Sequence, residues 1–278
     1  MELITIFLSA LMGVVGTGGV VLDTLAETAL RDQIAGAEDL QVRIDNAPNY
    51  QVVSGRIDHV RVAARGVETR QLPGLRIDSI DLETDVVDVD LGRLQQGKLY
   101  LDEPAQAALR LRLKDSDLNA FFQSPLVQGW LDTLQFSLPG EANARVQNRY
   151  GLANPSLEFL EGDRFRIMVD LQDQVTQENV AIVVDLGLTV VNGHRFTLVD
   201  PIITVDGAET PPELLESFVQ GAQDQLTLRR LEALGVLTRV IDFKVHDNAL
   251  DIAIFARIEP TSPLLSQQPT LQAVPPAP

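Results

Sequence analysis

Few side chains in this sequence are spaced for catalysis or metal binding. The three histidines, His59, His194 and His246, stand alone, without the His-x-x-x-His or His-x-His spacing of a zinc site. Cysteine is absent, which excludes disulfides, thiolate ligands and a cysteine nucleophile. The sequence also lacks a Gly-x-Ser-x-Gly nucleophile elbow, a dinucleotide-binding glycine motif and a P-loop. We therefore expect neither a metal nor a cofactor, and no nucleotide cradle.

Carboxylates are the remaining candidates for chemistry, and they gather between positions 81 and 90. Paired acids act in glycosidases and bind calcium. Here their spacing follows the solvent side of a strand whose other face is apolar, and no calcium-loop glycine accompanies them. A solvated sheet face is the favoured interpretation, and a carboxylate hydrolase is the weakest functional hypothesis. The residues are Asp81, Glu83, Asp85, Asp88 and Asp90.

A strict alternation of leucines and cations occupies positions 109–114. It predicts a strand with one apolar and one cationic face. The cations are candidates for holding a lipid headgroup, while an ordinary exposed face opposite acidic strands fits the same spacing. The leucines are Leu109, Leu111 and Leu113, and the cations are Arg110, Arg112 and Lys114.

Two apolar helical patterns are candidates for lining a lipid site. The first follows a helix start at Asp115 or Ser116, with Asp117 well placed for the positive end of the helix. The second opens at Pro211-Pro212. Their apolar residues either fill a core or line a tunnel; pattern alone favours the core, and the tunnel lining is the alternative that lipid binding requires. They are Leu118, Phe121, Phe122, Leu126 and Trp130 in the first helix, and Leu214, Leu215, Phe218 and Val219 in the second.

Most other elements follow a two-residue period and are expected to be strands. Apolar residues near two-residue spacing occur over 42–44, 57–62, 75–82 and 87–91, and further strands are expected at 144–149, 165–171, 180–191, 196–205, 241–246 and 250–258. Asn192-Gly193 is a strong hairpin signal. Helices are expected at 23–35, 115–134, 213–226 and 228–234. Strands that follow strands without an intervening helix predict an α+β fold with mostly antiparallel sheets.

Several segments together resemble one protein family. Gly55 to Val67, the run Asp88-Val89-Asp90-Leu91, Pro104 and the block ending Asp117-Leu118-Asn119 are similar to the LmeA-like family of phospholipid-binding proteins, in a cyanobacterial style. The resemblance covers roughly residues 21–260. It implies a lipid-binding protein of the cell envelope or internal membranes. We extrapolate from it an elongated, barrel-like domain of curved sheets with helices on their apolar faces, as in tubular lipid-binding proteins.

The net charge of the chain limits the classes of binding partner that we expect. The formal net charge of -17 disfavours nucleic acid, whose binding draws on clustered Lys and Arg. It also opposes purely electrostatic docking on an anionic bilayer. If the protein meets a membrane, apolar surface must supply the contact.

The two ends differ from the middle of the chain. Residues 3–22 carry no charge, and as a helix they would span about 30 Å, close to the thickness of a bilayer core. We expect residues 1–22 to be a signal or anchor segment; a segment lying on a membrane or in the domain mouth, and a buried soluble element, stay open. Residues 260–278, uncharged and rich in proline, are expected to be a disordered tail. The domain would then span 23–259, with half-barrels at 23–135 and 136–259 as one arrangement.

The leading hypothesis is a non-enzymatic, membrane-associated carrier that holds phospholipid acyl chains in an apolar cavity. Its expected partners are phospholipid and a membrane, and not nucleic acid. An extracytoplasmic location, in the periplasm or on the lumen side of thylakoids, is expected, with the cytoplasmic face left open. The alternative is a membrane-tethered scaffold or assembly protein with a solid core.

Overall fold

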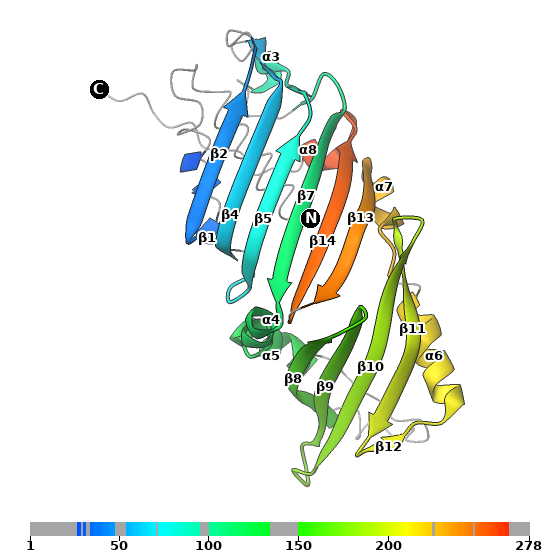
Figure 1. The fold of residues 1–278 in the computed structure, drawn as a ribbon. Helices are drawn as coiled ribbons and strands as arrows, with labels where there is room; N and C mark the ends of the chain where they lie inside the picture. Colours follow the sequence, from blue (N-terminus) through cyan, green and yellow to red (C-terminus); the bar gives the residue numbers. More distant parts are fainter. Residues whose placement is uncertain are drawn as a thin grey trace.

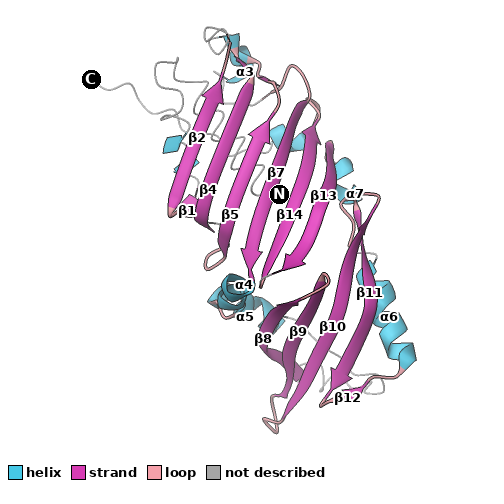
Figure 2. Ribbon diagram, viewed as in Figure 1, coloured by secondary structure: helices cyan, strands magenta, loops and turns pink. Residues whose placement is uncertain are grey.

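The computed structural model describes residues 27–28, 30–31, 34–47, 54–70, 72–94, 100–133, 150–223, 226–246 and 248–266. Two antiparallel sheets dominate this part of the chain and lie end to end (Figure 1). Strands far outweigh helices (Figure 2). The expectation of mostly antiparallel sheets is confirmed.

The larger sheet has the order β1-β4-β5-β7-β14-β13, and β2 also pairs with β4. Of its last two strands in the chain, β14 returns to lie beside β7, and β13 pairs with β14 at the edge. The second sheet is therefore inserted in sequence between β7 and β13. The strands of the larger sheet are β1 (Ile34–Gly36), β2 (Asp39–Asp45), β4 (His59–Thr69), β5 (Arg76–Thr84), β7 (Ala105–Lys114), β13 (Val236–His246) and β14 (Ala249–Ile258).

The second sheet is a meander with the order β12-β11-β10-β9-β8. Asn192 and Gly193, with φ of 54° and 67°, form the turn between β10 and β11, as their sequence predicts. A short ribbon of β3 (Arg56–Ile57) and β6 (Val87–Asp88) forms a separate two-stranded sheet. The strands of the second sheet are β8 (Tyr150–Leu160), β9 (Arg164–Asp173), β10 (Asn179–Val191), β11 (Arg195–Val205) and β12 (Ala208–Glu209).

Helices lie mainly at the edges of the sheets. The pair α4 and α5 contacts β8, whereas α6 contacts β11 and α7 contacts β13. The helix expected over 115–134 is interrupted at Gln123 and Ser124, which separate α4 from α5. The helices are α3 (Leu91–Leu94), α4 (Asp115–Phe122), α5 (Pro125–Thr133), α6 (Pro212–Gln223), α7 (Arg229–Glu232) and α8 (Pro263–Ser266).

The barrel-like arrangement is not confirmed. In the described part of the chain, β2 and β13 at the two ends of the larger sheet do not pair with each other, so no closed barrel forms. The sheets also group residues differently from two sequential halves, because β13 and β14 complete the sheet that begins with β1. The division into half-barrels stays a prediction.

Two segment boundaries differ from expectation. The helix expected over 23–35 stops short of Ile34, because β1 begins there and pairs with β4. The tail expected to be disordered from residue 260 is helical at α8, where Leu265 is only 3% exposed because it packs into the core. Residues 267–278 and the predicted anchor at 1–22 lie outside the described residues, as does the strand expected at 144–149.

Strand β8 has no counterpart among the expected elements. Gly151, Asn154 and Pro155 read as strand breakers, yet they lie within β8. The pairing of β8 with β9 shifts between Ala153 and Ser156, and Asn154 has a φ of 54°. Because β8 is the edge of its sheet, a bulge and a proline are tolerated there.

The two sheets meet through an apolar cluster that we call the junction. Val245 and Leu250 of the larger sheet pack with Phe159, Phe165 and other side chains of the second. The rings of Phe159 and Phe165 lie 5.5 Å apart in an edge-to-face arrangement. Phe243 of β13 bridges the sheets, with ring centroids 6.1 Å from Phe165 and 5.6 Å from Phe196. Aromatic packing therefore joins the two sheets.

Two hairpin turns of the second sheet also cap the outer edge of β13. The backbone N–H of Val240 donates to the carbonyl of Gly193 at 2.7 Å. The N–H of Val245 donates to Oδ1 of Asp163 at 2.7 Å. Asp163 has a φ of 58°, a conformation that asparagine and glycine also adopt. The edge of the larger sheet is thus closed by the second sheet instead of being left open to other strands.

Replacing Asp163 by glycine is expected to lower the free energy of unfolding by about 1–3 kcal/mol. Glycine keeps the backbone conformation but leaves the N–H of Val245 without its acceptor. Asp163→Asn keeps a carbonyl oxygen at the same position and should lose less than half as much. Urea unfolding of the two variants checks this, and equal losses would show that the hydrogen bond is unimportant.

Candidate functional site

One row of aliphatic side chains crosses five strands of the larger sheet on a single face. Val42, Val62, Leu82, Leu109 and Ile254 are successive cross-strand partners. Aligned residues of neighbouring strands share a face, so their side chains form a stripe. Val62 is buried, while the other four are half-buried. The middle of this apolar face is therefore not sealed by other described side chains in the way a finished core is.

A parallel row leads from this stripe to the second sheet. It runs from Leu40 of β2 to Ile252 and Phe243 at the far edge, through partners on β4, β5 and β7. Phe243 belongs to the junction. The apolar face of the larger sheet thus continues into the contact between the sheets.

The second sheet extends the same surface beyond the junction. Val184, Leu186 and Leu188 alternate along one face of β10, and Leu186 is buried in the junction. Val184 pairs with Ile167 of β9, which is 38% exposed. Ile182 and Val169 form the next half-buried pair on this face. We call the continuous apolar faces of both sheets the inner surface.

One end of the inner surface is closed by packing. Ile57 and Val87 of the short ribbon are 0% and 1% exposed, and they belong to the same cluster as the strands of the larger sheet. Leu265 of α8 joins them there. Packing is complete at these buried residues, whereas most residues of the stripe are only half-buried.

Helix α4 carries two of the predicted lipid-binding residues into the junction. Leu118 and Phe122 pack against its buried side chains. Asn119, between them, donates from Nδ2 to the carbonyl of Leu157 at 2.8 Å and accepts from the N–H of Leu157 at 2.7 Å. This pair of hydrogen bonds mimics a neighbouring strand, so α4 blocks the edge of β8 and is held rigidly.

Of the other predicted lipid-binding residues, only Phe121 lies beside these. Phe121 is half-buried, with its ring 6.3 Å from that of Phe122. Leu126 and Trp130 of α5 are 43% and 58% exposed. The second predicted group lies on α6, next to β11 and at the opposite side of the second sheet from α4 (Figure 1). There Leu215 and Val219 are half-buried, and the side chains of Leu214 and Phe218 lie outside the described residues. Their lipid-binding role stays a prediction.

The predicted headgroup cations lie on the face of β7 opposite the inner surface. Lys114 donates from Nζ to Oδ1 of Asp78 at 2.6 Å, and Nε of Arg112 lies 4.0 Å from Oδ2 of the same carboxylate. Arg110 is exposed and pairs across the strands with Asp81. A whole sheet thus separates these cations from the apolar stripe, and their headgroup role stays a prediction.

The pKa of Asp78 is lowered, chiefly by the hydrogen bond from Lys114 and then by the charges of Lys114, Arg76 and Arg112. A carboxylate with a lowered pKa stabilises the fold above its unfolded pKa of about 3.9, and this stabilisation is lost as the pH falls through the folded value. We expect Asp78→Asn to lose about 1 kcal/mol of unfolding free energy at pH 7. The difference from the unsubstituted chain should shrink below about pH 3.9. Urea unfolding at pH 7 and pH 3 measures it, with Asp39→Asn, on an exposed strand position, as the control; a loss that is the same at both pH values would contradict it.

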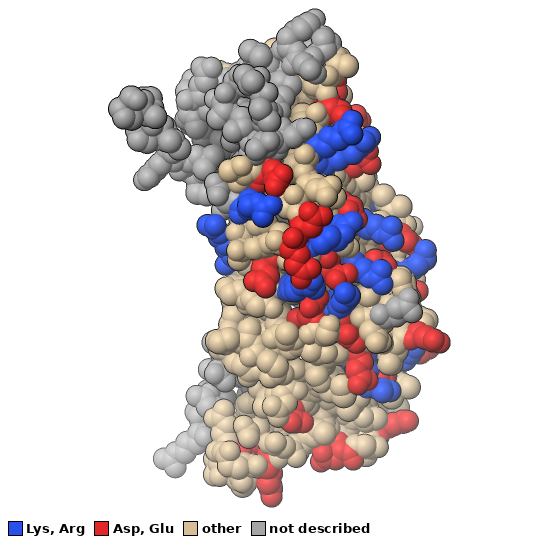
Figure 3. Space-filling model, turned by 60° about the vertical axis from the view of Figure 1, so that its left-hand side comes forward, with Lys and Arg blue, Asp and Glu red and all other residues tan. Residues whose placement is uncertain are grey.

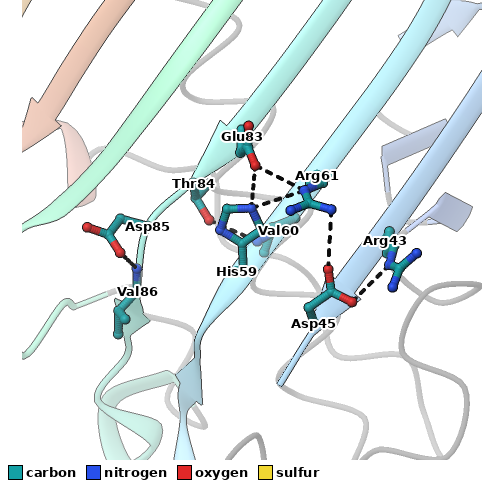
Figure 4. Close-up of polar contacts among 9 residues, drawn as sticks. All are labelled: Arg43, Asp45, His59, Val60, Arg61, Glu83, Thr84, Asp85 and Val86. Atoms are coloured by element: carbon teal, nitrogen blue, oxygen red, sulfur yellow. Dashed lines mark hydrogen bonds and ion pairs between the residues drawn. The ribbon is translucent and has the colours of Figure 1, made fainter. Parts of the chain in front are cut away.

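The clustered carboxylates are all engaged in hydrogen bonds or ion pairs: Asp81 and Glu83 lie on the outer face of β5, whereas Asp85, Asp88 and Asp90 lie in or beside β6 of the short ribbon. Glu83 Oε1 lies 2.6 Å from Nε2 of His59 and 3.0 Å from Nε of Arg61, as Figure 4 shows. These two hydrogen bonds lower the pKa of Glu83. Figure 4 also draws the hydrogen bond from Arg43 to Asp45, and this bond likewise lowers the pKa of Asp45. The others pair as Asp81 with Arg65, Asp88 with Arg56, Asp90 with Arg93, and Asp85 with the N–H of Val86. For Asp81 and Glu83 this arrangement is the solvated sheet face that the spacing indicates.

The side chains of the remaining histidines lie beside a backbone carbonyl and a carboxylate. His194 is 6% exposed and its Nδ1 lies 2.9 Å from the carbonyl of Asn192, while Nε2 of His246 lies 2.7 Å from Asp251. Across the described ranges, His, Asp and Glu form no group of three that could hold a metal ion. Nor does any helix within those ranges have both the length and the apolar character needed to cross a membrane.

Comparison with known proteins identifies a family for this chain. The profile of LmeA-like phospholipid-binding proteins matches residues 15–255. The chain belongs to this family. No curated protein and no solved structure matches the chain. The match covers both sheets and the junction of this LmeA-like protein, and so includes the whole inner surface.

The stripe residues on β2, β5 and β14 were not singled out by sequence reasoning as lipid-facing. Val42 and Leu82 lie in segments whose two-residue period predicted strands, and that period was the available signal. Which strands lie side by side, and therefore which side chains share a row, depends on the pairing of distant segments. Ile254 joins the row only because β14 returns next to β7.

Proposed function

We propose that this LmeA-like protein holds phospholipid acyl chains on its inner surface without catalysing a reaction. The observation that carries the proposal is the half-buried aliphatic row from Val42 to Ile254, which runs in register across five strands. A finished core would bury such side chains, whereas an acyl chain lying along them removes both surfaces from water. Each methylene buried in this way contributes about 0.8 kcal/mol.

The polar arrangement supports a carrier more than an enzyme. Glu83 and Asp81 on the outer face are engaged in ion pairs, and the larger sheet separates them from the inner surface. Membrane association follows from the ligand, because phospholipids are collected from and delivered to bilayers. Placement on an extracytoplasmic membrane of a cyanobacterial type of cell, the anchor role of residues 1–22 and action in the envelope stay predictions.

Purification without detergent followed by native mass spectrometry tests the proposal. We expect masses above that of the polypeptide by about one phospholipid per chain, which disappear after extraction with organic solvent. The ligand-free protein should take the lipid up again from vesicles. A polypeptide mass alone, together with no uptake, would instead favour a membrane-tethered scaffold whose sheets are packed without a ligand.

A further inference from the structure

Helix α5 presents two large apolar side chains outward. Leu126 and Trp130 are 43% and 58% exposed, and their spacing of four residues places them on one helix face. Pro125 and Gly129, on the same face, are exposed as well. A Cβ built at Gly129 meets no atom of the described residues within 4 Å, so a larger side chain at this position does not clash with them. The buried residues of α5, Val127 and Leu131, face the other way.

The surroundings of this helix face carry almost no charge. No Asp, Glu, Lys or Arg occurs from position 118 to 131, in a chain whose net charge is -17. Figure 3 brings this side of the molecule forward: charged side chains gather over the larger sheet, and the area below it, where α4, α5 and β8 lie, is mostly tan. A strongly charged partner would find no complementary charges on this surface. A partner without net charge that accepts apolar side chains would fit it.

The same helix pair forms the rim of the inner surface, and α4 is tied by hydrogen bonds to both sheets. Phe122 of α4 packs into the junction, while α5 follows directly after Ser124. Besides the paired hydrogen bonds of Asn119, Asp117 of α4 accepts from Arg76 of β5 at 2.9 Å. Seating this rim on another surface would therefore require little ordering of the protein.

We propose that the exposed face of α5 docks on the net-neutral, zwitterionic surface of a phospholipid bilayer, with Trp130 and Leu126 entering the headgroup region. Tryptophan favours this zone because its ring is apolar and its N–H is polar. The rim would then bring the inner surface against the membrane from which lipid is taken. Docking of α5 deepens the proposed function. The purpose of the docking rests on that function, whereas the contact between α5 and the bilayer does not.

The chain contains a single tryptophan, so its fluorescence reports on this face alone. Residues 1–22 are apolar as well, so flotation with vesicles does not tell which segment touches lipid. We expect phosphatidylcholine vesicles to shift Trp130 emission to shorter wavelength and to reduce its quenching by acrylamide at least about twofold. The shift should persist in 0.5 M salt, because no charge pairing contributes. No shift on addition of vesicles would overturn the docking proposal.

Substitutions at one open position provide matched variants. Gly129→Glu places a charge beside Trp130, and Gly129→Leu extends the apolar face, while neither removes an existing side chain. We expect the vesicle concentration needed for half the shift to rise at least about tenfold in Gly129→Glu and to fall in Gly129→Leu. Ile241→Asn removes a comparably exposed apolar side chain on β13, which is 66% exposed. This control should leave the vesicle concentration for half the shift unchanged. Equal behaviour of the two Gly129 variants would count against docking.

Removal of the vesicles separates docking from lipid capture. A shift that reverses when the vesicles are pelleted reports docking of α5. A shift that persists in the supernatant reports a lipid kept by the protein, which agrees with the proposed function and overturns docking as its cause. Conversely, a reversible shift in a protein that carries no lipid by mass spectrometry would uphold docking while the carrier function fails.

Discussion

Phe165→Ala is expected to lower the free energy of unfolding by about 3–5 kcal/mol. Phe165 is 6% exposed at the junction and lies against the rings of Phe159 and Phe243, so alanine leaves a cavity between two rigid sheets. Removal of a buried aromatic ring typically costs this much, because the surroundings collapse only in part. Urea-induced unfolding followed by circular dichroism measures the loss.

The neighbouring position on the same strand face supplies the control. Ile167→Ala also shortens an apolar side chain of β9, but Ile167 is 38% exposed, so its loss should stay near or below about 1 kcal/mol. Equal losses at the two positions would mean that the sheets are not held together at Phe165. A transition that splits into two steps in Phe165→Ala would show that the junction couples the sheets in unfolding.

Leu109→Trp is expected to weaken phospholipid binding roughly ten- to fiftyfold. The larger ring would occupy the middle of the aliphatic row and displace two or three methylene groups of a bound acyl chain, at about 0.8 kcal/mol each. Leu109 is half-buried, so the ring can be accommodated on the inner surface at a modest stability cost. Titration with a phospholipid that carries a fluorescent acyl chain measures the dissociation constant.

The next residue along β7 offers a matched variant on the opposite face. Arg110 is exposed on the outer face, so Arg110→Trp adds the same ring without touching the inner surface. It should leave the dissociation constant unchanged within about twofold. If Arg110→Trp weakens binding as much as Leu109→Trp does, the lipid does not lie on the row that includes Leu109 and the proposed function is wrong in its site.

The strands were the most predictable part of this fold. The alternation from Leu109 to Lys114 has a single plausible structure, and Asn192-Gly193 has few alternatives to a tight hairpin turn, because each depends on local backbone preferences. The interrupted strand β8 escaped prediction, since its tolerance for Pro155 comes from its position at a sheet edge. Position in a sheet is not a local property.

The candidate site was predictable in kind but not in place. Leu118 and Phe122 do reach an apolar cluster, yet Leu126 and Trp130, which follow the same helical pattern, face outward because the helix breaks at Gln123 and Ser124. The cations of β7 are on the face that alternation assigns to them. That the larger sheet lies between these cations and the apolar stripe follows only from the tertiary structure.

By itself, the sequence determined which residues alternate, where chains turn, that no cysteine or clustered histidine chemistry exists, and that the chain resembles a phospholipid-binding family. The tertiary structure alone decided that β14 returns beside β7 with β13 next to it, that the sheets meet at Phe165 and Phe243, and that the aliphatic rows align into one inner surface. The physical reason is range: side-chain alternation and turn preference act over a few residues, whereas strand pairing and burial join segments more than a hundred residues apart.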